Sequence, residues 1–518
     1  MNLKQMLEEV ASRYGRKTAI VSGDRRLSYA DLDKASNKLA NALLEIGVNK
    51  GDRIVTLLSN SPDFVIIYFG IVKAGATAVP LDPQYKIDEL VSIFNDCLPE
   101  VLIADGPTLE QLAPVLSRFA SIKHIVNLDS EHSGRNLSYQ EIMETGIAKK
   151  VEADSEPDDI AQIVYTSGPS FRPRGIMLYH RCLVEESAIS AYGYQQTDED
   201  IMMLFALPMY HVYGLVAGML ASLCKGSTVV IVPGTGLSIG AFMAAIEKEK
   251  GTMFIGVPYI FALAVDMAEK GGVKSDLSSL RLCASCGAPL SISVIKGFKK
   301  HYGFDVLNCL GLTEGTCHFS CQPLDGSGDP ESVGYAISGW EARVVDNSGY
   351  ELPPNQEGEI ILRGPIMKEY YNNPQATSEV IKNGWLYTGD IGKFGQEGNL
   401  FVTGRKKEII ILKGQNIEPD DIEPVLSMHP KVAEAAVIGI PDEMRGEIIG
   451  AVVSLKEGEK ATEQEIKKFC HERVIGYKVP KQVFFMDSLP RTAGGKIDKT
   501  AIRQRLSIPF PFPEASVS

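Results

Sequence analysis

Apolar segments of strand length alternate with amphipathic segments of helix length over residues 18–130. Residues 54–58 read IVTLL, an apolar run with the composition of a buried strand. Upstream of it, Ser28 and Asp31 have the spacing of a helix capping box, and the apolar stripe that follows stops at Gly47. Alternation of this kind predicts an α/β fold with a largely parallel sheet.

Length and charge narrow the functional class. A chain of 518 residues suggests about three domains of ordinary size, and its 44% hydrophobic content suffices for several cores. The formal net charge of −13 argues against a nucleic-acid binder, because such proteins need clustered Lys and Arg. Residues 1–17 lack an apolar signal core, and no apolar run reaches the length of a membrane span. We therefore expect a cytoplasmic protein, a monomer or a homodimer, with peripheral membrane contact left open.

The nine cysteines are irregularly spaced, which fits a reducing compartment rather than a disulfide framework. One group could form a zinc site or a redox pair: Cys283, Cys286, Cys309, Cys317 and Cys321, with His318 nearby. However, Cys317 and Cys321 lack the turn residues of a zinc knuckle, and Cys283 ends an apolar strand. Buried core thiols are therefore the favoured interpretation.

A loop rich in Gly, Pro, hydroxyl and guanidinium groups, TSGPSFRPRG, occupies residues 166–175 directly after the apolar strand 160–165. Such a loop can surround phosphates with backbone N–H groups, hydroxyls and positive charge, although an ordinary surface turn is the simpler alternative. No phosphate-loop ATPase motif is present. Residues 234–240 have the spacing GxGxxxG rather than GxGxxG, so we set a dinucleotide site aside.

The stretch 384–423 contains the run WLYTGD, a Gly-Asn hairpin turn and the basic triplet at residues 405–407. In isolation, two hairpins with a charged turn would explain it. The order and spacing of its motifs, however, closely resemble the ribose-binding and hinge segment of the adenylate-forming acyl-CoA synthetases. The resemblance implies that Asp390 binds the ATP ribose hydroxyls, that Arg405 contacts ribose or phosphate, and that Lys407 is a hinge between two domains.

The same resemblance extends to the loop at residues 166–175, which in the family closes over the ATP phosphates. Six positions match the family pattern: Thr166, Ser167, Gly168, Ser170, Pro173 and Gly175. Three depart from it: Pro169 replaces a hydroxyl residue, Phe171 replaces a flexible Gly, and Arg174 replaces Lys. Arg174 keeps the charge, whereas the other two changes leave a non-catalytic binding or regulatory homologue open as the alternative function.

Further segments carry implied roles by the same resemblance. Residues expected to bind nucleotide are Gly287, Ala288, Pro289, Asn308, Gly311, Leu312 and Thr313. Thr313 would touch the α-phosphate, and Glu314, with Thr166, would bind Mg²⁺. Residues expected to line the acid pocket are Tyr210, His211, Val212, Gly256, Gly287 and Gly311, with His211 also gating the thioester step. Lys413 and Gly414 would lie on the CoA side. Leu310 replaces the aromatic residue that usually stacks on adenine.

The carboxy-terminal part predicts a small α+β module, with helices at 419–429 and 462–474 and strands at 432–439 and 448–455. By resemblance it carries the adenylation lysine, Lys496, in the pattern PRTAGGK. We expect a large adenylation domain with parallel α/β sheets over 1–406 and a small mobile domain over 407–518.

The activity that the resemblance implies is an ATP-dependent acid–CoA ligase that uses Mg²⁺ and coenzyme A. Amino-acid-activating relatives commonly place an Asp just after the segment that contains His211, and residues 215–220 contain none. A plain carboxylic acid is therefore expected. The Gly-, Met- and apolar-rich pocket segments favour a fatty acid of medium or long chain, or an aromatic acid.

Overall fold

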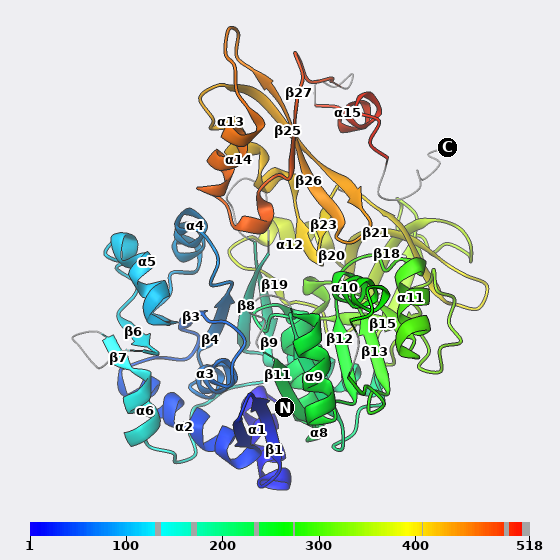
Figure 1. The fold of residues 1–518 in the computed structure, drawn as a ribbon. Coiled ribbons are helices and arrows are strands. Elements are labelled where there is room, and N and C mark those ends of the chain that lie inside the picture. The colour runs from blue at the N-terminus through cyan, green and yellow to red at the C-terminus, as the bar shows by residue number, and fades with distance from the viewer. Residues whose placement is uncertain are drawn as a thin grey trace.

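The structure, a computed structural model, describes residues 1–129, 136–166, 174–232, 238–272, 275–406, 408–491 and 497–509. Figure 1 shows a large body, coloured blue to yellow, with a smaller orange and red body above it. The large body is built on two mainly parallel sheets and a third, antiparallel sheet; the small body has a sheet of its own. The expected fold class is confirmed.

The first sheet of the large body contains the predicted strand at 54–58, which is β3 and begins one residue earlier. Its strands β4, β3, β5, β6, β7 and β8 are mutually parallel neighbours, and β9 and β19 add antiparallel at one edge. In order they are β19 (Glu369–Tyr370), β9 (Arg174–Tyr179), β8 (Ile160–Thr166), β4 (Thr77–Leu81), β3 (Arg53–Leu57), β5 (Val101–Ala104), β6 (His124–Asn127) and β7 (Asn136–Ser138).

The second sheet has a parallel centre from β1 to β14 and antiparallel strands at both edges. In order its strands are β16 (Tyr335–Ala336), β15 (His318–Cys321), β14 (Val306–Gly311), β13 (Leu282–Ser285), β12 (Met253–Gly256), β10 (Ile201–Phe205), β11 (Thr228–Val232), β1 (Thr18–Ser22) and β2 (Arg25–Ser28).

Helices form three layers around these two sheets. The largest core lies between the sheets and includes residues of α1 (Leu3–Tyr14), α2 (Tyr29–Glu45), α3 (Pro62–Lys73), α7 (His180–Gly193), the π-helix η2 (Tyr213–Leu220) and α8 (Ala221–Lys225). A second core packs α9 (Ile239–Glu249), α10 (Pro258–Glu269) and α11 (Ile292–Tyr302) on the outer face of the second sheet. A third packs α4 (Ile87–Cys97) and α5 (Gly106–Leu116) on the outer face of the first, and α6 (Tyr139–Thr145) lies against α2.

The predicted capping box starts α2. The Ser28 side chain accepts the backbone N–H of Asp31, and the Asp31 carboxylate accepts the N–H of Ser28. Gly47, where the apolar stripe stops, has a φ of +90°, a conformation that other residues rarely adopt. Local capping and a terminating glycine thus place this helix where the sequence predicts it.

The third sheet joins the large body to the small one. Its strands are β17 (Glu341–Val345), β18 (Gly358–Arg363), β21 (Trp385–Phe394) and β20 (Ile381–Lys382), with β22 (Leu400–Arg405) paired to β21. Two short helical segments lie near it, α12 (Pro374–Val380) and the 3₁₀ turn η3 (Thr313–Gly315). The chain passes from β22 directly into the small body.

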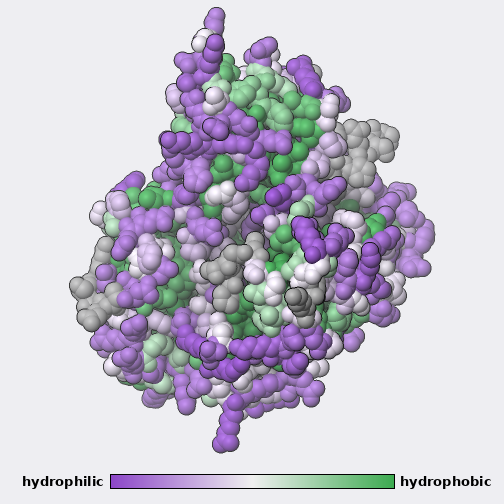
Figure 2. Space-filling view, viewed as in Figure 1, coloured by the Kyte–Doolittle hydropathy of each residue, from purple (hydrophilic) through white to green (hydrophobic). Residues whose placement is uncertain are grey.

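The small body has its own sheet and its own cores. Its strands are β24 (Gln415–Ile417), β23 (Ile410–Leu412), β26 (Gly446–Leu455), β25 (Val432–Asp442) and β27 (Gln482–Phe485). Its helices are α13 (Glu423–Ser427), α14 (Glu463–His471) and α15 (Lys499–Arg505), and η5 (Gly476–Lys478) is a 3₁₀ turn. In Figure 2, hydrophilic residues cover most of the visible face, and an apolar area remains on the small body.

One predicted helix is wrong in extent. Residues 419–429 form the 3₁₀ turn η4 (Pro419–Asp421) and the short helix α13 (Glu423–Ser427) instead of one continuous helix. Pro424 explains the break, because proline has no N–H to continue the helical hydrogen bonds. The helix expected at 462–474 is shorter, since α14 runs from Glu463 to His471 with Thr462 as its cap.

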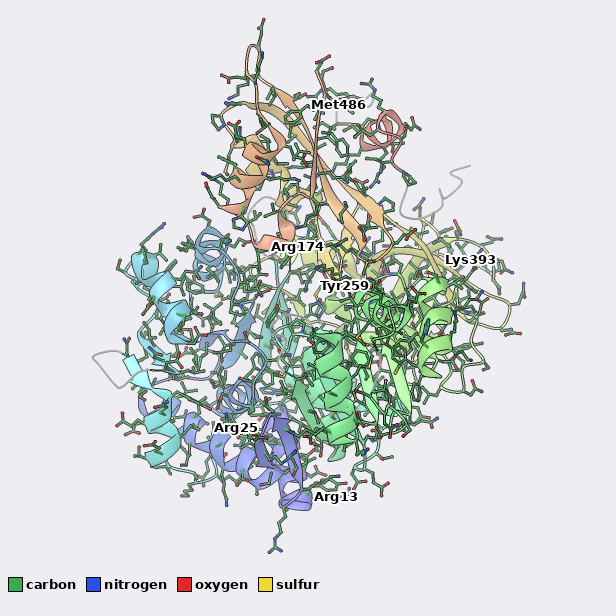
Figure 3. All side chains as sticks on the ribbon, in the orientation of Figure 1. Arg13, Arg25, Arg174, Tyr259, Lys393 and Met486 are labelled. Atoms are coloured by element: carbon green, nitrogen blue, oxygen red, sulfur yellow. The ribbon has the colours of Figure 1, made fainter. Side chains whose placement is uncertain are left out.

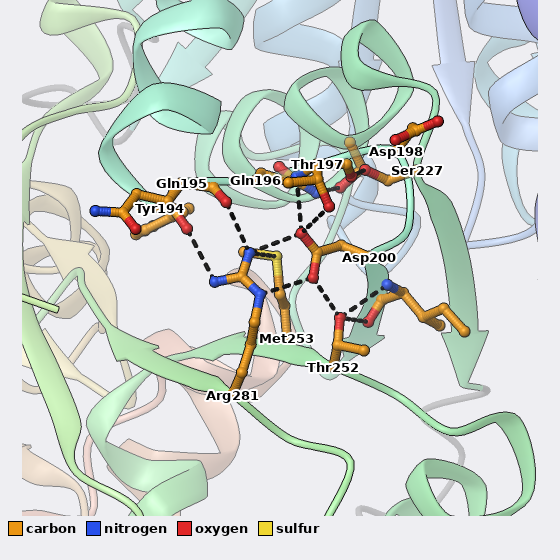
Figure 4. A network of polar contacts seen from close by, with 12 residues as sticks. Tyr194, Gln195, Gln196, Thr197, Asp198, Asp200, Ser227, Thr252, Met253 and Arg281 are labelled. Carbon is orange, nitrogen blue, oxygen red and sulfur yellow. Dashed lines mark hydrogen bonds and ion pairs between the residues drawn. The ribbon is translucent and has the colours of Figure 1, made fainter. Parts of the chain in front are cut away.

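A polar network fixes the amino-terminal ends of β10, β12 and β13 (Figure 4). Arg281 donates from Nε and Nη2 to the two oxygens of Asp200, at 2.8 and 2.7 Å. The hydroxyl of Thr252 donates to Asp200 as well, at 2.8 Å. This edge is structural, because the candidate site lies at the opposite, carboxyl ends of the strands.

Candidate active site

A cavity of about 410 Å³ opens at the carboxyl ends of the parallel strands, beneath the small body. In α/β sheets this edge is where ligands bind, because the loops that follow the strands converge there. From the large body, its lining comes from 80–82 at the end of β4, 164–166 on β8, Arg174 at the start of β9, 210–211 after β10, 312–314 after β14, 386–390 on β21 and 405–406 at the end of β22. The small body contributes Gln415, Asn416, Glu418 and Tyr477.

Asp390 and Arg405 lie in this lining as paired residues of β21 and β22. Nε of Arg405 is 2.6 Å from Oδ1 of Asp390. Burial raises the pKa of Asp390 above its ordinary value, and the Arg405 guanidinium opposes part of that rise. The side chain of Asp390 is 4% exposed. The pair therefore presents a fixed carboxylate and a fixed cation to the cavity, as expected for a group that binds sugar hydroxyls.

Thr313 and Glu314 follow β14 and line the cavity together with Thr166 at the end of β8. The hydroxyl of Tyr370 donates to Oε1 of Glu314, at 2.8 Å, and fixes the carboxylate. Two hydroxyls and a carboxylate from two different sheets thus line the same cavity. Oxygen ligands of this kind suit a hard cation such as Mg²⁺.

Arg174 also lines the cavity, and its guanidinium is held by the small body. Nη2 of Arg174 lies 3.0 Å from both Oε1 and Oε2 of Glu418. Figure 3 shows Arg174 at the junction of the two bodies. The expected role of Arg174 at the phosphates stays a prediction, and no sequence motif indicates this partner.

Tyr210 and His211 reach the cavity after β10. The hydroxyl of Tyr210 donates to Oδ2 of the buried Asp82, at 2.7 Å. Burial lowers the pKa of His211 to about 4, and its Nδ1 accepts the N–H of Tyr213 at 3.3 Å. His211 is therefore neutral at pH 7, a state that suits a gate to an uncharged passage better than an ion-pair partner.

Several predicted site residues do not line the cavity in this conformation: Gly175, Val212, Gly256, Gly287, Ala288, Pro289, Asn308, Gly311, Lys413 and Gly414. Asn308 instead donates from its side chain to the Ser332 carbonyl, at 3.3 Å. A Cβ on Gly175 would lie 2.8 Å from Ile163, so this glycine lets β9 pack closely. For these two residues, packing and fold stabilisation explain the residue type.

Gly287 and Gly414 meet across the two bodies. A Cβ added to Gly287 would lie 3.6 Å from the Gly414 carbonyl oxygen, and one added to Gly414 would lie 2.5 Å from Val257. Next to them, Nζ of Lys413 lies 4.6 Å from the ring centroid of Tyr259. The predicted CoA-side residues are thus in contact with the glycine loop after β13, and glycine permits this close approach.

Eight residues of interest lie outside the described ranges: Ser167, Gly168, Pro169, Ser170, Phe171 and Pro173 of the phosphate loop, the hinge candidate Lys407, and Lys496. Their predicted roles stay predictions.

The sequence reading missed a second contact between the bodies, at α4. Oε1 of Glu89 lies 3.3 Å from Nζ of Lys478, and Oε2 accepts the N–H of Ile475 at 2.9 Å. Lys478 also lies 3.4 Å from Asp421. Tyr477, which lies between Ile475 and Lys478 in the chain, lines the cavity. No sequence motif marks this group, because Glu89 and Lys478 are 389 residues apart.

The cysteines fit the favoured interpretation. All nine are free, and all except Cys224 are buried. Burial raises the pKa of Cys283 to about 12, and it also raises those of Cys286, Cys309 and Cys317. Glu186, Cys317 and His318 do approach one another, but Glu186 already accepts from Trp340 and Ser190. Protonated thiols in an apolar interior are packing groups rather than metal ligands.

No helix in the described ranges has the length and apolarity needed to cross a bilayer.

Sequence profiles of two protein families match the chain. The profile described as AMP-binding enzyme matches residues 7–371, and that of the AMP-binding enzyme C-terminal domain matches residues 421–496. Three relatives span nearly the whole chain. They are an oxalate–CoA ligase of Arabidopsis thaliana (33% identical; 97% of this chain, 98% of the relative), an indoleacetate–CoA ligase of Aromatoleum aromaticum (34%; 97% and 98%) and a long-chain-fatty-acid–CoA ligase of Bacillus subtilis (32%; 97% and 94%).

Solved structures of similar proteins superpose over the whole chain, but not equally well. The amide bond synthetase McbA from Marinactinospora thermotolerans gives a TM-score of 0.86 (26% identity; 98% of this chain, 99% of that one). The o-succinylbenzoate CoA synthetase of Bacillus subtilis, bound with a product analogue, gives 0.85 (27%; 96% and 98%). ATP-bound MatB from Rhodopseudomonas palustris gives 0.72 at similar identity and coverage (28%; 98% and 99%).

Proposed function

The chain belongs to the AMP-binding enzyme family, and on that basis we propose that it is an AMP-forming acid–CoA ligase. One observation carries the proposal: a single cavity at the strand ends is lined by the Asp390–Arg405 pair, by Thr313 and Glu314, and by Thr166. A sugar, a phosphate chain and a hard cation would each find suitable partners there.

In the first half-reaction, a carboxylate oxygen of the acid attacks the α-phosphorus of ATP. The bond from phosphorus to the bridging oxygen breaks, pyrophosphate leaves, and an acyl-adenylate remains. Asp390 would hold the ribose, Thr313 the α-phosphate and Arg174 the outgoing phosphates. This step depends mainly on position and on neutralising charge, because phosphoryl transfer requires little covalent participation from the protein.

Glu314 and Thr166 would hold Mg²⁺, and the bound ion would supply positive charge next to the phosphates. The oxygen donors on the cavity wall fit this ion. Tyr370 orients the Glu314 carboxylate through Oε1, and Oε2 accepts no hydrogen bond within the described ranges.

In the second half-reaction, the CoA thiol gives its proton to solvent and its sulfur attacks the acyl carbon. The bond from the acyl carbon to the bridging oxygen of the mixed anhydride breaks, and AMP leaves with that electron pair. Splitting the reaction in this way replaces a poor leaving group with AMP. By its place at the cavity, neutral His211 would border the path of the thiol. Lys413 and Gly414, which contact the loop at Gly287, would lie on the CoA side.

We assign the observed orientation of the two bodies to this second half-reaction. The contact between Gly414 and Gly287 supports the assignment.

For the acid we propose a fatty acid of medium or long chain, or an aromatic acid. The segment after His211 is the π-helix η2, all of whose residues are buried and none of which is charged, so it offers no partner for an α-ammonium group. Two of the relatives described above are named for a long-chain fatty acid and for indoleacetate.

A half-reaction assay tests the proposal. With a panel of fatty and aromatic acids, the enzyme should release pyrophosphate from ATP only when an acid is present, and should form AMP and a thioester when CoA is added. Tight ATP binding without acid-dependent pyrophosphate release would favour the alternative, a binding or regulatory homologue. Pyrophosphate release without thioester formation would contradict the CoA ligase and leave an adenylating enzyme with another acceptor.

A further inference from the structure

Two cysteines face each other on neighbouring strands of the second sheet. Cys309 of β14 and Cys321 of β15 are directly opposite in the antiparallel register. The N–H of Gln322 donates to the Asn308 carbonyl at 3.1 Å, so the next pair along the ladder, Cys309 with Cys321, occupies a non-hydrogen-bonded position. Opposite residues approach most closely at such positions, with Cα atoms about 4.5 Å apart, which is within the range that a disulfide spans.

The two thiols are already in contact. The Cys309 thiol donates to Sγ of Cys321, and the two sulfur atoms are 3.2 Å apart. Within the described ranges, no other two cysteine sulfurs are hydrogen-bonded to each other. A disulfide bond is about 2.05 Å long, so a displacement of about 1 Å between the strands would bring these sulfurs to bonding distance.

The pair lies one strand away from an edge of the sheet. Only β16 lies beyond β15 at this edge, and both of its residues, Tyr335 and Ala336, are exposed. Tyr335 is the neighbour of Cys321 across the ladder. Cys321 is 8% exposed and Cys309 is 3% exposed. Hydrogen peroxide, an oxidant little larger than water, therefore reaches Cys321 first.

The two cysteines bracket a segment that the proposed function uses. Residues 310–320 contain Thr313 and Glu314, which line the cavity. The backbone of Glu314 is held by Met367, whose N–H donates to its carbonyl at 2.7 Å, and its carboxylate is held by Tyr370. Drawing β14 and β15 together by about 1 Å displaces the base of this segment. Misplacement of that size can cost about 100-fold in rate.

We propose that Cys309 and Cys321 form a redox modification site: hydrogen peroxide converts the two thiols into a disulfide, which slows acyl-adenylate formation by displacing the segment between them. The Cys321 sulfur attacks peroxide, the O–O bond breaks, the sulfur takes a hydroxyl group as a sulfenic acid, and water leaves with the thiol proton. The Cys309 sulfur then attacks the Cys321 sulfur, the S–O bond breaks, and a second water leaves with the Cys309 proton. Two thiols and one peroxide thus give one disulfide and two waters. The effect on acyl-adenylate formation rests on the proposed function, whereas the disulfide does not.

Peptide mapping without reduction tests the site in the wild-type protein. After treatment with hydrogen peroxide and alkylation of the remaining thiols, cleavage after Glu314 separates Cys309 from the other two cysteines of the hairpin, and cleavage after Phe319 separates Cys317 from Cys321. The Cys309 peptide should be joined to the Cys321 peptide, and a thiol reductant should separate them. Burial, and after it the contact with Cys321, raise the pKa of Cys309, so the oxidation should be slow at neutral pH. Separate Cys309 and Cys321 peptides, or a disulfide between other cysteines, would overturn the proposal.

Acid-dependent pyrophosphate release connects the disulfide with catalysis. The oxidised wild type should lose about tenfold or more of its rate, and a thiol reductant should restore it. Cys321→Ala should keep its rate under the same treatment, because it cannot form the disulfide. Cys317→Ala is the matched control, since it removes a buried thiol of the same hairpin that does not face Cys309, and it should respond as the wild type does.

Two results of this assay would also overturn the proposal: a full rate in protein that is shown to hold the disulfide, or an equal loss of rate in Cys321→Ala and the wild type. Peptide mapping uses neither ATP, acid nor CoA, so its failure would leave the ligase assignment intact. Absence of acid-dependent pyrophosphate release from the reduced enzyme would remove that assignment, and with it the catalytic effect of the disulfide.

Discussion

Nε of Arg405 lies 2.6 Å from Oδ1 of Asp390, so the two residues expected to bind the nucleotide sugar hold each other at the cavity wall. They face each other across the β21–β22 hairpin, whose register fixes the pair. The pair is preorganised, since neither side chain has to search for its position when the ligand arrives.

Asp390→Asn should therefore weaken ATP binding and leave the fold in place. The amide keeps the shape but loses the charge that accepts sugar hydroxyls and balances Arg405, a loss of about 1–3 kcal/mol, which raises the KM for ATP by about 5- to 150-fold. Initial-rate kinetics with ATP varied measure this change. Glu397→Gln, at the exposed turn of the same hairpin, is the matched control and should keep the wild-type KM. An unchanged KM in Asp390→Asn would remove this residue from the site.

Lys478→Met should separate the two half-reactions. The substitution leaves Glu89 and Asp421 without their shared cation in the docked orientation, which weakens docking. Thioester formation from supplied acyl-adenylate should fall on the order of tenfold or more, because breaking a buried pair typically costs several kcal/mol. Acid-dependent pyrophosphate release should fall much less.

Lys431→Met is the control for this experiment, since Lys431 pairs with Glu465 inside the small domain and is partly exposed. Equal loss of both half-reactions in Lys478→Met would show a general structural defect instead of a docking contact.

Docking should weaken as the pH rises towards neutrality. Burial raises the pKa of Asp421 to about 7, although Lys478 opposes the rise; Glu418 and Glu89 add to it. In the undocked enzyme the carboxyl returns to its ordinary pKa, about 4. Between these two values only the docked form holds the proton, so the docking equilibrium should fall by up to about tenfold per pH unit from pH 4 to pH 7 and then level off.

Exchange of the Ile475 amide between pH 5.5 and 8, corrected for the intrinsic exchange rate, measures this dependence. Asp421→Asn removes the titrating group and should flatten the profile. A wild-type profile that is already flat, or one that rises with pH, would contradict the assignment to Asp421.

Arg281→Met should lower stability without changing catalysis. Burial acts to raise the pKa of Asp200, but the hydrogen bonds from Arg281, Thr197 and Thr252 outweigh it and hold the pKa below its ordinary value. The network therefore stabilises the fold at neutral pH, and this contribution is lost as the pH falls below about 4. Loss of Arg281 should reduce the unfolding free energy by about 1–3 kcal/mol in urea titrations at pH 7.

Arg181→Met removes an exposed pair with Asp158 and should change stability by less than about 1 kcal/mol. The kcat of Arg281→Met should equal that of the wild type, because the network lies at the strand ends away from the cavity. A large fall in kcat with unchanged stability would contradict the structural role.

Much of the fold could be predicted because its signals are local. The capping box at Ser28 and the apolar run at 54–58 act through residues a few positions apart, and the structure has both elements. The helix expected at 419–429 is interrupted because Pro424 outweighs the apolar pattern around it. A proline inside an otherwise periodic segment interrupts the helix, and apolar periodicity alone does not predict that interruption.

The candidate site likewise combines residues that local motifs predict with contacts that no local motif predicts. Asp390, Thr313 and Glu314 belong to short sequence motifs, and each lines the cavity. The contact of Arg174 with Glu418 joins residues 244 positions apart in different domains. Its existence depends on how the small domain is oriented, which no spacing within one motif encodes.

We expect one chain to perform two half-reactions in two orientations of its small domain, and Lys496→Ala tests this expectation most directly. A lysine that neutralises the charge developing at the α-phosphorus is worth on the order of 10²–10³ in rate, so acid-dependent pyrophosphate release should nearly disappear. Thioester formation from supplied acyl-adenylate should persist near the wild-type rate, because we assign that step to the orientation in which Gly414 contacts Gly287. Full pyrophosphate release in the folded variant, or equal loss of both half-reactions, would contradict the account.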